Sequence, residues 1–157
     1  IACTIKGLPC GVGEPMFDGL ENRISQAVFA IPAIKGIEFG DGFKLSELKG
    51  SEARDEYVAS DGKIAITSNH NGGILGGIST GEAVNFRVCI KPTPSISIPS
   101  KSVSYSRGDN VELKISGRHD PCIALRAVPC VEAAAAIAVL DLMLGDINFS
   151  GRFVFND

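Results

Sequence analysis

Apolar and polar side chains alternate most regularly between Ala83 and Lys91, where Val84 and every second residue after it as far as Ile90 are apolar. A period of two is typical of a β-strand with one buried face, and Pro92 and Pro94 would end such a strand. Weaker alternation predicts further extended segments over 1–5, 34–39, 96–105 and 111–115. Residues 44–62 are charged and nearly aperiodic, which predicts an exposed, mobile loop.

Two segments have helical spacing instead. Apolar residues from Phe17 to Ile31 recur every three or four positions, which predicts a helix starting near Glu14-Pro15 and ending before Pro32. Residues 127–144 are apolar almost all round and end at a glycine, which predicts a helix buried on most sides. Two acidic residues interrupt that run, so we do not expect it to span a membrane. The simplest matching architecture is α+β, with helices between antiparallel β-sheets.

Composition narrows the classes of function. The chain has 157 residues, 45% of them hydrophobic and 21% charged, which suits one compact domain or part of a larger one. Its net charge of −3 gives no overall basic field for nucleic acid or an anionic membrane, so local cations would have to bind any anionic ligand. Five cysteines at irregular spacing and only two histidines favour reduced thiols in a cytosolic protein over a metal site.

A glycine-rich segment, residues 72–81, is the first candidate for chemistry. Five glycines in ten residues either expose backbone N–H groups to an anion or allow close packing of the chain. It is not a Walker loop, because Ile78 stands where that motif needs lysine, and it does not match the dinucleotide-binding pattern G-x-G-x-x-G.

Two further segments combine cations with other polar groups. Residues 91–95, Lys-Pro-Thr-Pro-Ser, are either a stiff phosphate-binding loop or an ordinary turn after a strand. In Gly117–Cys122, Arg118 is suited to bidentate binding of phosphate or carboxylate. Asp120 is either a general base or a helix cap followed by Pro121 at the first helical position, and it is also suited to a salt bridge. A histidine beside an aspartate, as at His119, is usually structural.

Together, and in this order, these segments resemble the chorismate synthase family. The resemblance also includes Gly11–Asp18, Ile31–Gly36, Gly40–Phe43 and Arg126–Pro129, and it covers almost the whole chain apart from the last dozen residues. Family members are longer than this chain. We therefore expect residues 1–157 to form a single domain, the C-terminal half of such a protein, and the first residue, Ile1, fits that expectation because it is not methionine.

The resemblance implies a carbon–oxygen lyase of the shikimate pathway, which leads to the aromatic amino acids. Such an enzyme removes phosphate from C3 and a proton from C6 of 5-enolpyruvylshikimate-3-phosphate and thereby gives chorismate. The family needs reduced FMN although the reaction has no net redox change, and some members reduce the flavin with NADPH while others use an outside reductant. The family further implies a cytoplasmic homotetramer, without nucleic-acid or membrane partners.

The resemblance also assigns residues. The family's FMN contacts correspond to Pro32, Ala33, Gly76, Lys91, Pro92, Thr93, Pro94, Ser95 and Arg118. Arg118 would also touch the substrate, and Asp120 would be the catalytic proton acceptor. The family's catalytic histidines belong to the other half, so neither His70 nor His119 corresponds to them. Arg126 either pairs with an acidic residue or supports the site.

Two alternatives to an active enzyme remain. The chain either binds FMN weakly without chemistry, or it is purely structural and needs the other half even to fold.

Overall fold

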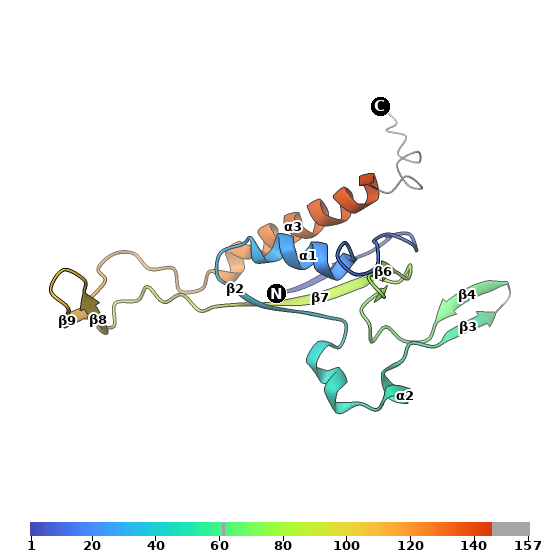
Figure 1. Cartoon of the computed structure of the whole chain (residues 1–157), viewed down its shortest axis with the longest axis horizontal. Helices are drawn as coiled ribbons and strands as arrows, with labels where there is room; N and C mark the ends of the chain where they lie inside the picture. Colours follow the sequence, from blue (N-terminus) through green and yellow to red (C-terminus); the bar gives the residue numbers. More distant parts are fainter. Residues whose placement is uncertain (61, 146–157) are drawn as a thin grey trace.

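The centre of the fold is a three-stranded antiparallel sheet in the order β1-β7-β2. A computed structural model describes residues 1–60 and 62–145. The strands are β1 (Ala2–Ile5), β7 (Val84–Ile90) and β2 (Ile34–Phe39). Two helices, α1 (Leu20–Phe29) and α3 (Ala124–Gly145), lie together on one face of this sheet (Figure 1). The fold is therefore α+β.

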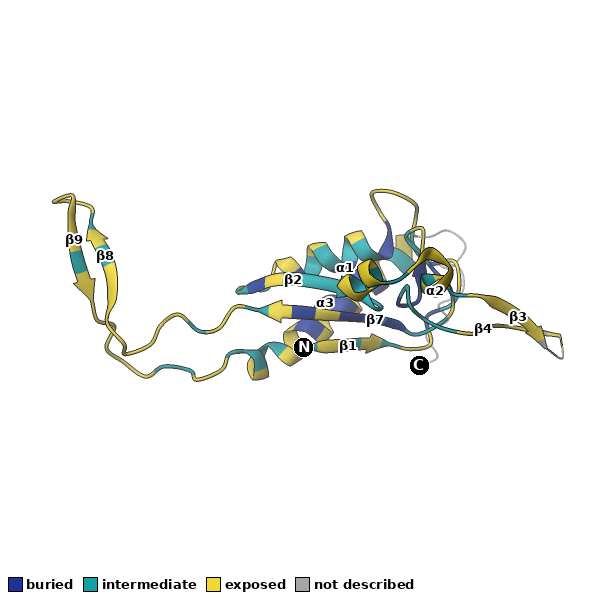
Figure 2. Cartoon of the chain, turned by 90° about the horizontal axis from the view of Figure 1, so that it is seen from below, coloured by how far each residue is buried: buried dark blue, intermediate teal, exposed yellow. Residues whose placement is uncertain are grey.

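Strand β7 confirms the period-two prediction. Val84, Phe86 and Val88 are buried towards the helices, whereas Arg87 and Cys89 are exposed on the other face. Figure 2 shows buried and exposed stretches along β7. The predicted strands at 1–5 and 34–39 are its two neighbours, and the segment predicted from 111 corresponds to β9 (Asp109–Leu113).

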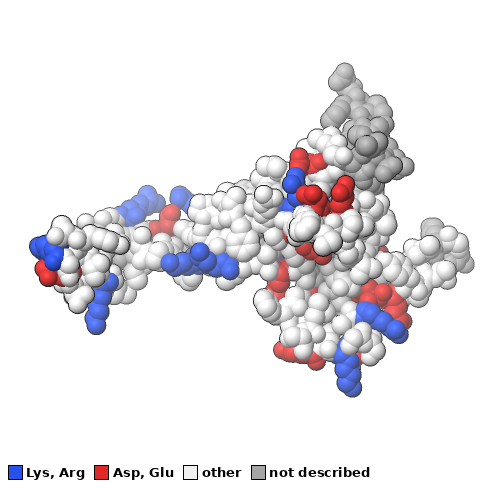
Figure 3. Space-filling model, in the orientation of Figure 1, with Lys and Arg blue, Asp and Glu red and all other residues white. Residues whose placement is uncertain are grey.

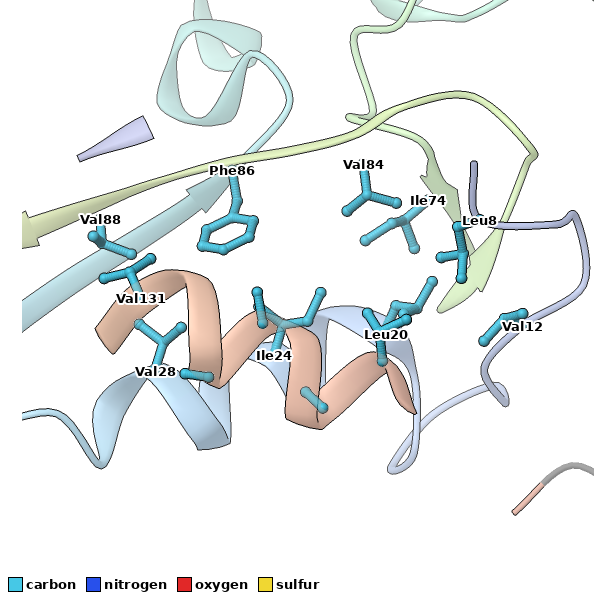
Figure 4. Close-up of a cluster of buried hydrophobic side chains, with 14 of the residues drawn as sticks. Leu8, Val12, Leu20, Ile24, Val28, Ile74, Val84, Phe86, Val88 and Val131 are labelled. Carbon is cyan, nitrogen blue, oxygen red and sulfur yellow. The ribbon is translucent and has the colours of Figure 1, made fainter. Parts of the chain in front are cut away.

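The core lies between the sheet and the two helices. Leu20, Ile24 and Val28 of α1 are fully buried, and they meet Val131 of α3 and Phe86 of β7 (Figure 4). Small residues on the inner side of α3 bring the two helices close together, namely Ala134, Ala135 and Ala138.

Helix α1 begins later than its sequence pattern predicts. Met16 has a φ of +71°, a left-handed conformation that interrupts a helix, so Glu14-Pro15 lies outside α1. The backbone N–H of Leu20 donates to the carbonyl of Gly77 at 2.8 Å, which satisfies a group at the helix start from a distant segment. The start of α1 therefore depends on tertiary structure that the local pattern does not contain.

Helix α3 is less buried than predicted. Its inner face packs on α1 and the sheet, but its outer face exposes Leu125, Ile137, Leu140 and Leu144. Burial on most sides requires cover on both faces of the helix layer, and within residues 1–60 and 62–145 only one face is covered. By length and composition alone, α3 would also be able to cross a membrane, a property that core helices of soluble proteins share.

The segment predicted as a loop at 44–62 contains regular structure. A 3₁₀ helix η1 (Gly42–Glu47), a short helix α2 (Gly50–Ala53) and a strand β3 (Tyr57–Ser60) occupy most of it. Strand β3 pairs with β4 (Lys63–Ile66), and β5 (Ile74–Leu75) pairs with β6 (Ile78–Ser79). Many of these residues are exposed, as predicted, but the absence of a regular period did not mean an absence of secondary structure.

The remaining strands form a hairpin that projects from the body. Strand β8 (Ser100–Ser104) pairs with β9, and residues 91–99 and 114–123 connect the hairpin to β7 and α3 (Figure 1). We call residues 91–123 the arm. The extended pattern predicted from Ile96 forms a strand only from Ser100, because the prolines at 92, 94 and 99 have no N–H for a ladder.

Candidate functional site

The residues assigned to the flavin fall into two groups at opposite ends of β7. Gly76 lies in the turn between β5 and β6, and the neighbouring Gly77 bonds Leu20 at the start of α1. Ala33 follows the end of α1, and its carbonyl accepts the backbone N–H of Lys91 at 2.8 Å. Helix α1 has 10 residues, so a rise of about 15 Å separates the two ends.

At the first end, the glycines mainly allow close packing. A side chain on Gly73 would lie 2.6 Å from the carbonyl oxygen of Ala83, and one on Gly77 would lie 2.8 Å from that of Glu14. Gly76 differs, because a Cβ there would meet no atom within 4 Å among the described residues beyond its chain neighbours, although its φ of +62° still favours glycine. The segment 72–81, which we call the glycine turn, is therefore tightly packed at most glycines and open at Gly76.

Asp55 anchors the loop that leads into the glycine turn. Its carboxylate accepts hydrogen bonds from Ser68 Oγ at 2.6 Å, from the backbone N–H groups of His70 and Asn71, and from Asn71 Nδ2. Partial burial alone raises the pKa of Asp55, but these hydrogen bonds outweigh it and lower the pKa to about 2. The ring of His70 lies 2.7 Å from Asp41, so His70 joins two loops.

At the second end, several polar groups have no partner. Lys91 has no carboxylate within 4 Å among residues 1–60 and 62–145. The hydroxyl oxygen of Thr93 is buried and forms no hydrogen bond in the same part of the chain. Ala33 has a φ of +70°, unusual for a residue with a side chain, and Pro32 beside it is exposed. The rest of the loop, residues 92, 94 and 95, is exposed.

The segment before α3 completes this end. Arg118 is exposed and makes no ion pair within the described part of the chain. Asp120 accepts a hydrogen bond from Arg126 Nη1 at 3.1 Å, while the buried Nε2 of His119 has no partner among the described residues. Helix α3 begins at Ala124, so Asp120 and Pro121 do not cap a helix, whereas a salt bridge of Asp120 is present. We call residues 32–33, 91–95 and 118–126 the open end.

Local charge at the open end is opposite to that of the whole chain. The open end, residues 32–33, 91–95 and 118–126, contains Lys91, Arg118 and Arg126 against Asp120, a net of +2, although the chain as a whole carries −3. Figure 3 shows Lys and Arg spread along the arm and the adjacent part of the body. A local excess of positive charge attracts anions, and the negative net charge of the whole chain conceals this local excess.

The open end fits an anionic, phosphate-bearing cofactor. Two unpaired cations, a buried hydroxyl without a partner and backbone in a left-handed conformation match what a phosphate group binds. The open end lies on an exposed surface and not in a cavity. A separate hollow of about 480 Å³, on the outer face of the sheet, is lined by other residues, including Gly36, Phe43 and Cys89. Among the described residues, no three His, Cys, Asp or Glu side chains are placed to hold a metal ion.

Comparison with known proteins gives one consistent result. The family model described as chorismate synthase matches residues 1–144. The chorismate synthase of Lancefieldella parvula is 50% identical over 143 residues, covering 91% of this chain and 38% of that protein. The chorismate synthase of Archaeoglobus fulgidus is 49% identical over 144 residues, covering 92% of this chain and 40% of that protein.

A solved structure agrees with these relatives. The crystal structure of a chorismate synthase matches with a TM-score of 0.67 and 29% identity, covering 91% of this chain and 36% of that one. The chain thus spans roughly two fifths of the length of the curated relatives, whose covered shares are 38%, 42% and 40%.

Proposed function

The chain belongs to the chorismate synthase family, and we propose that it supplies the flavin-phosphate-binding and proton-accepting part of a chorismate synthase. The observation that carries this proposal is the open end of β7. There the side chains of Lys91, Arg118 and Thr93 have no partner among the described residues, and Asp120 is two residues from Arg118 in sequence. Such a set suits a phosphorylated ligand beside a proton acceptor.

The proposed reaction is the elimination of phosphate from 5-enolpyruvylshikimate-3-phosphate to give chorismate. When bound, reduced FMN would supply electron density that helps the allylic phosphate to leave, with no net redox change. Lys91 and Arg118 would bind phosphate oxygens, and Arg118 would also touch the substrate. Asp120 would take up a proton released in the elimination. The loop residues Pro92, Pro94 and Ser95, with Pro32 and Ala33, would shape the cofactor site.

Gly76 lies away from the other residues that are assigned to the cofactor. Its assignment rests on the family resemblance, and it lies about the length of α1 from the open end. Because a Cβ there would meet no described atom within 4 Å beyond its chain neighbours, a ligand is able to approach the Gly76 backbone closely. We therefore propose that Gly76 contacts a different part of a bound molecule from the one that Lys91 and Arg118 hold.

Turnover would also need the part of the family's polypeptide that this chain does not cover, because the catalytic histidines implied by the family lie there. The bare outer face of α3 is consistent with a further layer of protein on the helices. The full proposal comprises a cytoplasmic homotetramer that uses reduced FMN.

The test measures chorismate formation by absorbance, under anaerobic conditions, with chemically reduced FMN and 5-enolpyruvylshikimate-3-phosphate. The chain alone should give no turnover. The chain complexed with the portion of the Archaeoglobus fulgidus relative that it does not cover, which we call the complemented enzyme, should make chorismate. Asp120→Ala should abolish that activity.

Two outcomes would contradict the proposal. Turnover by the chain alone would show that the missing portion is dispensable. A folded complemented enzyme that binds FMN without turnover would support the alternative function, a flavin-binding module. That alternative draws on the same observation, since the unpaired cations lie in this chain while the implied histidines do not.

A further inference from the structure

Arg126 and Asp120 are joined across the start of α3. Arg126 is the third residue of the helix, and its backbone N–H donates to the carbonyl of Ile123 at 3.1 Å. Asp120 lies in the irregular segment that precedes the helix. The hydrogen bond from Arg126 Nη1 to Asp120 Oδ2 therefore ties a side chain on an irregular segment to a regular, fixed element.

The contact uses only one of the two carboxylate oxygens. Asp120 Oδ2 accepts the bond from Arg126, whereas Oδ1 accepts no hydrogen bond from residues 1–60 and 62–145. A carboxylate held by one oxygen keeps its other oxygen available to accept a proton. The geometry is thus compatible with both orientation and proton acceptance.

The two arginines beside Asp120 differ in their partners. Arg118 is two residues from Asp120 in sequence, yet within the described part of the chain it has no carboxylate partner. Arg126 makes the contact with Asp120 instead, and the guanidinium of Arg118 is available for an anionic ligand.

We propose that Arg126 is a positioning residue: it fixes Asp120 Oδ2 and leaves Oδ1 to accept the proton. This inference rests on the proposed function. Overall, the C–H bond at C6 breaks and the proton ends on Oδ1, while phosphate leaves with the electron pair of the C–O bond and a new C=C bond forms. Arg126 itself gains and loses no proton.

If the pair were purely structural, any loss of activity in an Arg126 variant would follow its loss of folded protein; the positioning role predicts otherwise. The side chains of Arg126 and Asp120 are 77% and 42% exposed, and exposed pairs of this kind contribute about 0–1 kcal/mol to stability. Arg107 and Asp109 form a comparable exposed pair on the hairpin, at 3.6 Å. Removing either arginine should therefore change stability little, and only the loss of Arg126 should impair the reaction.

The experiment compares Arg126→Gln, Arg126→Lys and the control Arg107→Gln in the complemented enzyme. We expect Arg126→Gln to lower kcat by about 10- to 100-fold, because a misplaced catalytic group costs that much. FMN affinity, measured by fluorescence titration, should change little, since Arg118 keeps its charge and its donors. Arg126→Lys should fall between Arg126→Gln and the unaltered protein, and Arg107→Gln should match the unaltered protein.

Chemical rescue separates positioning from folding. Added guanidinium chloride at low, non-denaturing concentration should restore part of the kcat of Arg126→Ala, and it should not restore Asp120→Ala. The inference is overturned if Arg126→Gln behaves like Arg107→Gln, if its loss of kcat follows its loss of folded protein, or if guanidinium gives no rescue. Full activity of Asp120→Ala would instead overturn the role of Asp120 in the proposed function, whatever Arg126→Gln shows.

Discussion

The two ends of β7 differ in how completely their polar groups are satisfied. At the end with the glycine turn, Asp55 accepts four hydrogen bonds and Asn69 bonds both Ala83 and Gly73. At the open end, Thr93 Oγ1 and His119 Nε2 are buried without partners among the described residues. A buried polar atom without a partner costs free energy, and such costs are concentrated at sites that wait for a ligand or another chain. The glycine turn is thus a rigid support, and the open end is where binding is expected.

The largest expected effect is a loss of stability when a tightly packed glycine of the glycine turn is substituted. Gly73→Ala would place a Cβ 2.6 Å from the carbonyl oxygen of Ala83 at a φ of +80°, which should cost about 2–4 kcal/mol of stability. Gly76→Ala is the matched control: with open space around it and a φ of +62°, it should cost only about 1 kcal/mol. Urea denaturation followed by circular dichroism measures both. Equal costs would contradict the distinction between packed and open glycines.

The next effect concerns binding at the open end. Arg118→Gln should weaken FMN binding by about tenfold or more, because a charge-assisted hydrogen bond is lost. The exposed side chain of Arg118 makes no ion pair among the described residues, so stability should stay the same. Fluorescence titration of FMN with the complemented enzyme measures the change, and Arg107→Gln is the control. An unchanged affinity would remove Arg118 from the cofactor site.

Much of the fold was predictable because local patterns of apolar and polar residues determine it. The strand 84–90 has one face towards the core, so its alternation survives in the sequence. The start of α1 was not predictable, because it depends on the bond from Leu20 to Gly77, 57 positions away. Regular structure within 44–62 was missed because much of it is exposed and therefore imposes no apolar period.

The residues of the candidate site come from the family resemblance and stay predictions, and their arrangement could not be predicted from the sequence. The contact between Ala33 and Lys91 crosses from the segment before β2 to the end of β7, and no local spacing reveals it. The pairing of Arg126 with Asp120 spans six residues, which is not a helical spacing, so the sequence left the role of Arg126 open. Which part of a bound flavin each assigned residue contacts stays a prediction.

A smaller effect is the pH dependence of the stability that Asp55 contributes. The folded pKa of Asp55 is about 2, below its ordinary 3.8, so its ionised form stabilises the fold, by about 1–2 kcal/mol after allowance for solvent screening. This stabilisation is complete above about pH 5, is roughly half lost by pH 3, and disappears as the pH falls through the folded value. Asp55→Asn should therefore lower stability at pH 7, and its difference from the unaltered protein should fall to about half of that value at pH 3. A difference that does not depend on pH would contradict this explanation.

The smallest effect is a footprint of the cofactor. Cys122 is exposed at the open end, and Cys10 is exposed beside the glycine turn, where a side chain on Gly81 would contact it at 3.6 Å. Bound FMN should slow alkylation of Cys122 in the complemented enzyme and leave the alkylation of Cys10 unchanged. Mass spectrometry of peptides after timed alkylation measures both rates. Protection of Cys10 alone would place the cofactor at the other end of β7.

The most direct test of the central claim is to map FMN on the chain by amide chemical shifts in the complemented enzyme, with only this chain labelled by ¹⁵N. We expect the largest changes at Lys91, Thr93 and Ser95 and at Arg118–Asp120, with a smaller change at Gly76. Changes confined to the glycine turn, or spread evenly over the sheet, would contradict the assignment of the phosphate-binding site to the open end.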